Sequence, residues 1–146
     1  MKANSTPNLK TLPAGGSSAA YAINDLDEVA GETLAPGGQY HAFWKSAGSG
    51  KDEGFVDLGV LSGHLTSCAL GINRGGRIVG WSQANDPSTQ KAVIWYNDGA
   101  MVDLITKVSN PSGWTLRSAE AVNDGGKIVG WGLKNSIEAA FLLTPN

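Results

Sequence analysis

Three asparagines recur at intervals of about 50 residues, and a repeated polar side chain is a natural place to look for chemistry. Asn24, Asn73 and Asn123 each end an apolar segment and precede a short polar turn. Their amides could contact a ligand at one rim of a repeat protein. Because asparagine in a tight turn commonly hydrogen-bonds its own backbone, we favour a structural role for all three.

Carboxylates also occupy a fixed place in the repeat. Asp57 and Asp103 end matching segments of the first two copies, and Asn8 falls at the corresponding place of the third. Two carboxylates could serve as acid and base in a glycosidase if their separation suited that reaction. No further acid–base group accompanies them, so we expect them to clamp turns, and we predict no catalytic residue.

The few potential metal ligands are scattered along the chain. His41 and His64 are the only histidines, and Cys68, the only cysteine, stands beside apolar residues. A buried, inert thiol is expected, and one cysteine excludes an internal disulfide. The acidic turn at residues 24–28 lacks the glycine and the bidentate glutamate of a calcium loop. We therefore predict neither a metal site nor a cofactor.

The elements that must position these side chains are written three times. The asparagines are followed at matching distances by Val29-Ala30-Gly31, Ile78-Val79-Gly80 and Ile128-Val129-Gly130. Glycine-containing turns separate the two motifs in the second and third copies, as in a tight hairpin. Such self-similarity indicates stacked supersecondary units.

Each repeat is predicted to contribute four short antiparallel strands. The first ends at the asparagine and the second carries the glycine; the third holds residues 41–44, 92–95 or 139–142, and the fourth residues 55–58 or 101–104. We align Trp44 with Trp95, which predicts that these indoles lie on one face and that Phe43 and Ile94 lie on the other.

The predicted fold is a single all-β domain over residues 1–146. Its repeats span approximately residues 13–61, 62–107 and 108–146, with residues 8–12 as the fourth strand of the third sheet and residues 1–6 as a flexible tail. Supplying the last strand from the chain start would close the repeat and remove a sheet edge. The three sheets could form a β-prism, which we favour, or three β-propeller blades that make a six-bladed ring in a homodimer.

Composition narrows the classes of partner. The chain has 146 residues, 41% of them hydrophobic and only 16% charged, with a net charge of −2 and scattered basic residues. A nucleic-acid footprint is not expected from this pattern, and the short apolar runs predict no membrane insertion. A monomer is favoured.

Several segments resemble the bacterial HAF repeat, described as a probable extracellular repeat. They are His41-Ala42-Phe43-Trp44, the Ile-Asn and Ile-Val-Gly cadence, Val56-Asp57-Leu58-Gly59 and residues 140–145. The resemblance covers residues 8–145, although Ala92-Val93-Ile94 and Ala139-Ala140-Phe141 replace the signature tripeptide. It implies an extracellular or cell-surface location with a removed signal peptide, and it brings no known activity.

Binding is expected where the copies differ. A short insertion at residues 107–114 places Trp114 near Asn110, where its ring could take a sugar or a partner's side chain, or could plug the core instead. Trp81 and Trp131 share one position of the second strand, at which the first repeat has Glu32. We predict that Trp114, Asn110, Trp81 and Trp131 contact the ligand.

Two function classes remain. We favour an exported, non-enzymatic interaction module that binds an unknown protein or glycan through its rim loops. The alternative is an enzyme whose axial site lacks recognisable motifs. A surface structural domain without a specific ligand is a third reading.

Overall fold

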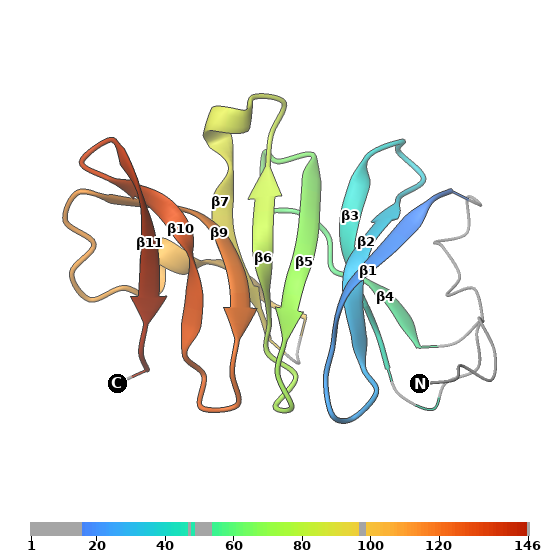
Figure 1. The fold of residues 1–146 in the computed structure, drawn as a ribbon. Coiled ribbons are helices and arrows are strands. Elements are labelled where there is room, and N and C mark those ends of the chain that lie inside the picture. Colours follow the sequence, from blue (N-terminus) through green and yellow to red (C-terminus); the bar gives the residue numbers. More distant parts are fainter. Residues whose placement is uncertain (1–15, 47, 49–53, 97–98, 146) are drawn as a thin grey trace.

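The structure, a computed structural model, describes residues 16–46, 48, 54–96 and 99–145. It confirms an all-β fold of three antiparallel sheets, each drawn from one repeat (Figure 1). The first sheet has the order β1-β2-β3-β4, built from Ser18–Ile23, Val29–Leu34, Tyr40–Lys45 and Phe55–Asp57. The second has the order β5-β6-β7-β8, built from Thr66–Ile72, Ile78–Gln83, Lys91–Trp95 and Met101–Asp103.

The third sheet has the order β11-β10-β9 in the described residues, built from Ile137–Leu143, Ile128–Lys134 and Trp114–Val122. Two short 3₁₀ helices, η1 at Pro87–Thr89 and η2 at Leu104–Lys107, lie in connections. The predicted closing strand at residues 8–12 and the predicted tail at residues 1–6 lie outside the described residues. Within the described part of the chain, no helix is long and apolar enough to cross a bilayer.

The sheets follow one another in a row, as Figure 1 shows. Strand β5 packs on β1, β2 and β3, and β9 packs on β5, β6 and β7. Two apolar cores result. The first, between the first and second sheets, contains Ala30, Ala42, Ile78 and Trp95; the second, between the second and third sheets, contains Val79, Ile94, Leu116 and Phe141. Each sheet thus packs against the next one in the row.

The repeated glycine has a steric cause. A Cβ atom at Gly80 would lie 1.9 Å from the carbonyl oxygen of Cys68, and one at Gly31 would lie 2.0 Å from that of Ala19. The first strand of each repeat has an irregular register beside this glycine, between Ala20 and Ala22 in the first copy. The bulged backbone comes so close to the second strand that no side chain fits there.

One predicted register is wrong. Phe43 pairs with Gly31 and Val93 pairs with Gly80, so Trp44 corresponds to Ile94 and not to Trp95. The connections between the second and third strands differ in length among the repeats, and a slip of one residue moves a side chain to the other face. Trp44 and Trp95 therefore belong to different faces of their sheets, and both contact the first core.

Candidate functional site

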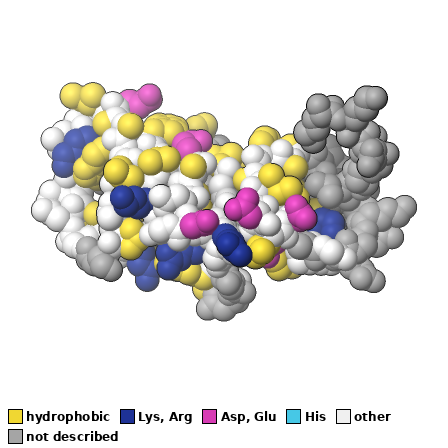
Figure 2. Space-filling model, turned by 60° about the horizontal axis from the view of Figure 1, so that its bottom comes forward, with side chains coloured by type: hydrophobic (Ala, Val, Ile, Leu, Met, Phe, Trp, Pro, Cys, Tyr) yellow, Lys and Arg dark blue, Asp and Glu magenta, His cyan; other side chains and the backbone are white. Residues whose placement is uncertain are grey.

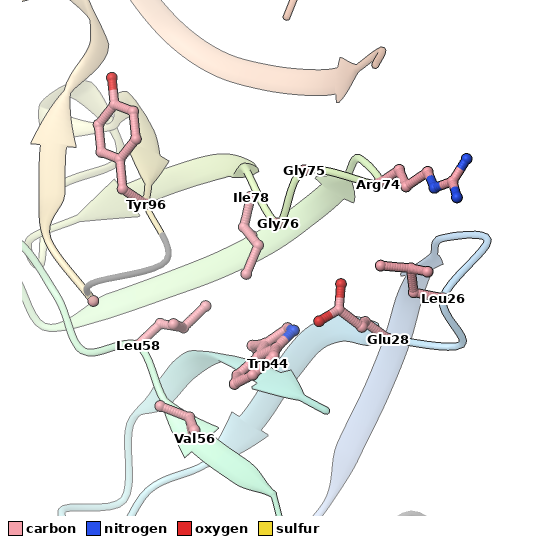
Figure 3. Close-up of a pocket in the computed structure, with 11 residues that line it drawn as sticks. Leu26, Glu28, Trp44, Val56, Leu58, Arg74, Gly75, Gly76, Ile78 and Tyr96 are labelled. Carbon is pink, nitrogen blue, oxygen red and sulfur yellow. The ribbon is translucent and has the colours of Figure 1, made fainter. Parts of the chain in front are cut away.

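A cleft of about 640 Å³ lies between the first and second sheets. Figure 3 shows Trp44, Val56 and Leu58 on one side of the gap, and Ile78 with the turn at residues 75–76 on the other. Strand β3 supplies Trp44 and β6 supplies Ile78, so the two walls come from neighbouring repeats. We call this cavity the first cleft.

A buried indole holds one wall of the first cleft in place through a hydrogen bond. Trp95 is fully buried, and its Nε1 donates a hydrogen bond to the carbonyl oxygen of Leu58 at 3.1 Å. The segment that carries Leu58 is thereby attached to the second sheet. Because this segment belongs to the first repeat, the bond joins both walls of the cleft.

Two opposite charges lie at the mouth of the first cleft. The Asn24 Nδ2 amide donates to Glu28 Oε2 at 2.5 Å, and Figure 3 shows the carboxylate of Glu28 directed into the gap. Arg74 lies on the facing turn and extends outward. The cleft therefore combines an apolar interior with an acidic and a basic group at its rim, which suits an amphipathic ligand.

The repeat places an equivalent cleft of about 420 Å³ between the second and third sheets. Ile94, Leu104 and Ile128 occupy the positions of Trp44, Leu58 and Ile78, and Arg77 occupies the position of Glu28. Trp44 and Glu28 thus have an aliphatic and a basic counterpart in the second cleft, whereas Tyr96 lines both clefts. The two clefts therefore differ in the shape and charge of their linings at equivalent positions.

The asparagine side chains hydrogen-bond the backbone of their own turns, as predicted. Asn73 Oδ1 accepts from the Arg77 amide at 2.9 Å, and Asn123 Oδ1 accepts from the Lys127 amide at the same distance. Their second role was not predicted. Asn24 Nδ2 donates to the Asn73 carbonyl at 3.0 Å and Asn73 Nδ2 to that of Asn123 at 2.9 Å, so each turn is bonded to the next.

Two of the four predicted binding residues come together. Asn110 and Trp114 line a cavity of about 200 Å³ beside Phe141. The Trp114 ring packs edge-on against Phe141, with ring centroids 6.4 Å apart, and Lys134 Nζ lies 5.5 Å from the Trp114 centroid. Asn110 Oδ1 accepts from the Ser112 hydroxyl at 2.8 Å. Trp114 therefore combines core packing with partial exposure.

The other two predicted residues lie elsewhere. Trp81 and Trp131 occupy equivalent places on β6 and β10, opposite Ala92 and Ala140, and both are half-buried. They line none of the three cavities described here. Their first-repeat counterpart, Glu32, accepts a hydrogen bond from the Tyr21 hydroxyl at 2.9 Å.

Sequence reasoning missed the residues of the first cleft. A signal was present at the fourth position after each repeated asparagine, where the acidic Glu28 stands in place of the basic Arg77 and Lys127. The apolar wall gave no such signal, because Trp44 and Ile78 are ordinary strand residues. Their meeting in one cleft depends on how two sheets from different repeats pack together.

Two pairs of titratable side chains lie within the first and second repeats. His41 Nδ1 lies 3.0 Å from Asp57 Oδ2, and Lys91 Nζ lies 2.8 Å from Asp103 Oδ2. Asp57 also accepts from the Gly59 amide at 2.8 Å, as expected of a turn clamp. In the described ranges no three His, Cys, Asp or Glu side chains gather as a metal site would require.

Cys68 is a buried free thiol, as predicted. Burial raises its pKa well above the ordinary range, and the nearby Glu32 carboxylate raises it further. The nucleophilic thiolate is therefore disfavoured at neutral pH.

Comparison with models of protein families, with curated proteins and with solved structures finds no match for this chain.

Proposed function

We propose that the domain is a non-enzymatic interaction module and that the first cleft binds a segment of a partner protein. The observation that carries the proposal is the combination of an apolar interior, lined by Trp44, Leu58 and Ile78, with the Glu28 carboxylate at its mouth. Such a site accepts an apolar side chain flanked by a lysine or an arginine. A half-buried tryptophan at the centre is a typical anchor of a protein interface.

The surface around the cleft supports recognition of a mixed sequence. Figure 2 shows acidic and basic side chains interspersed with apolar ones on the end of the molecule that carries the turns. A field of one sign, which would select nucleic acid, is not seen on this face. Specificity would then come from individual pairs, with Glu28 and Arg74 as charged residues that line the cleft.

Carbohydrate is the second candidate, and Trp114 is the observation that favours it. An indole beside Asn110 is a suitable platform for a sugar ring. The ammonium of Lys134 lies over the same ring, however, and would have to move before a sugar could stack on that face. The protein-binding proposal needs no such rearrangement.

The resemblance to the HAF repeat supports an exported or cell-surface module. In that setting the cleft would bind a partner outside the cell. The enzyme alternative would gain support from turnover in a hydrolase or lyase screen.

Selection of a displayed peptide library against the protein, followed by calorimetry, tests the proposal. Selected peptides should carry an apolar residue next to a basic one. Trp44→Ala should weaken their binding by at least about tenfold, or about 1.4 kcal/mol. Glu28→Arg, which copies the residue of the second cleft, should weaken binding of the basic peptides similarly.

Trp114→Ala is the matched control, since it removes an indole outside the first cleft. Circular dichroism should show that every variant remains folded. Peptides that bind the Trp44 and Glu28 variants as tightly as the original protein would contradict the proposal. A glycan-array signal lost only in the Trp114 variant would establish carbohydrate binding instead.

A further inference from the structure

The two ends of the row of sheets resemble the two sides of the junctions between sheets inside the chain. At each internal junction, the face of one sheet receives the first strand of the next, as β1–β3 receive β5. The third sheet has such a face and β1 is such a first strand. Neither is covered by a further sheet in the described residues.

The outer face of the third sheet exposes apolar residues whose counterparts in the second sheet are buried. Val79 is fully buried at the second junction, and its counterpart Val129 is 43% exposed. Ile94 is 4% exposed and its counterpart Leu142 is 61% exposed. The ladder pairs Val79 with Ile94 and Val129 with Leu142, so each pair forms one surface.

The first strand of the first sheet shows the reciprocal difference. Ile72 of β5 is 8% exposed where it packs on the first sheet, whereas its counterpart Ile23 of β1 is 65% exposed. Ala69 is fully buried and its counterpart Ala20 is exposed. The two ends are therefore complementary halves of one junction.

In the described residues, the series of hydrogen bonds between successive turns stops at the same two ends. Asn24 and Asn73 each donate Nδ2 to the carbonyl of the next turn, and in the described residues no following turn faces the exposed Asn123. A second bond repeats the pattern, because the Arg74 amide donates to Asp124 Oδ1 at 2.9 Å. Asp25 holds the place of Asp124 in the first turn.

We propose that a second copy of this chain docks head to tail, with its β1 on the outer face of β10 and β11. In this junction Asn123 Nδ2 donates to the Asn24 carbonyl of the second copy. The Asp124 amide donates to the Asp25 carboxylate of that copy. Such a contact joins two different surfaces, so a pair of copies can use it at both ends and close into a ring. Six sheets fall within the usual range for a closed ring of blades.

Sedimentation velocity over a range of concentrations tests the junction. The original protein should form a reversible dimer. Leu142→Glu and Ile23→Glu should each weaken self-association by at least about tenfold, because a junction would bury an unpaired carboxylate. Asn123→Asp keeps the acceptor of the turn and replaces the donor with a negative charge, and it should also weaken the dimer. Ile137→Glu, on the same strand as Leu142 but on its other face, should not.

A mixture of two variants distinguishes a head-to-tail contact from a symmetric one. Leu142→Glu retains an intact β1, and Ile23→Glu retains an intact third sheet, so an equimolar mixture should recover a dimer through one junction. A mixture that stays monomeric would overturn the head-to-tail geometry. An original protein that stays monomeric at every concentration would leave this face to another partner and overturn the proposal. Chains that lengthen with concentration would overturn the closed ring.

Discussion

The side-chain amide of Asn73 donates to the backbone carbonyl of Asn123 at 2.9 Å, while its own carbonyl oxygen accepts from the Arg77 amide in the same turn. One side chain thus closes its own hairpin and attaches it to the next. This double role gives a reason for asparagine to recur at the equivalent position of each repeat. Substitutions can separate the two functions, since the side-chain oxygen closes the turn and the side-chain nitrogen bonds the next turn.

Asn73→Asp should destabilise the fold, because aspartate keeps the acceptor for the Arg77 amide and replaces the donor with a charge facing a carbonyl. Asn73 is buried, so we expect a loss of about 1–3 kcal/mol of unfolding free energy. The matched control is Asn123→Asp in the monomeric Leu142→Glu background, where the effect should stay within about 0.5 kcal/mol. Urea unfolding measures both, and equal losses would refute the inter-turn role.

Gly80→Ala should be poorly tolerated, since the new Cβ would meet the Cys68 carbonyl at 1.9 Å. We expect a loss of about 1–3 kcal/mol or more, which thermal and urea unfolding would register. Gly37→Ala is the control, because no atom lies within 4 Å of its Cβ and no positive φ is required there. If Gly80→Ala proved as stable as Gly37→Ala, the close approach of the two strands would be in error.

Trp95→Phe should lower stability and loosen the first cleft together. The change removes the hydrogen bond from Nε1 to the Leu58 carbonyl and leaves a void in a fully buried site. A loss of about 2–4 kcal/mol is expected in urea unfolding. Hydrogen exchange at residues 58–61 should accelerate as well. Unchanged exchange there would show that this bond does not hold the wall.

Cys68 should resist thiol reagents in the folded protein and react once urea unfolds it. Burial raises its pKa, so the folded state favours the neutral thiol. The resulting contribution to stability is present at low pH and is lost as pH rises past the ordinary thiol value of about 8.5. Cys68→Ala should flatten this part of the pH profile. Rapid alkylation of the native protein at pH 7 would contradict the assignment.

Much of the secondary structure was predictable because its signals are local. The hairpins were predicted from the asparagine turns and the repeated glycine. In the structure, two paired β-strands flank each asparagine turn. The fourth strands at Phe55–Asp57 and Met101–Asp103 were also predicted within a residue. The register of the third strand was not, because it depends on connection lengths that differ among the repeats.

By itself, the sequence determined that this is an all-β chain of three copied units and that each repeated asparagine closes its own turn. Those features follow from backbone sterics and short-range hydrogen bonds, which neighbouring residues control. Only the tertiary structure decided that Trp44 and Ile78 line one cleft and that Trp95 is hydrogen-bonded to the Leu58 carbonyl. It also decided that Val129 and Ile23 are exposed, although their counterparts Val79 and Ile72 are buried. These relationships join different repeats. They depend on how the sheets pack, which no local pattern encodes.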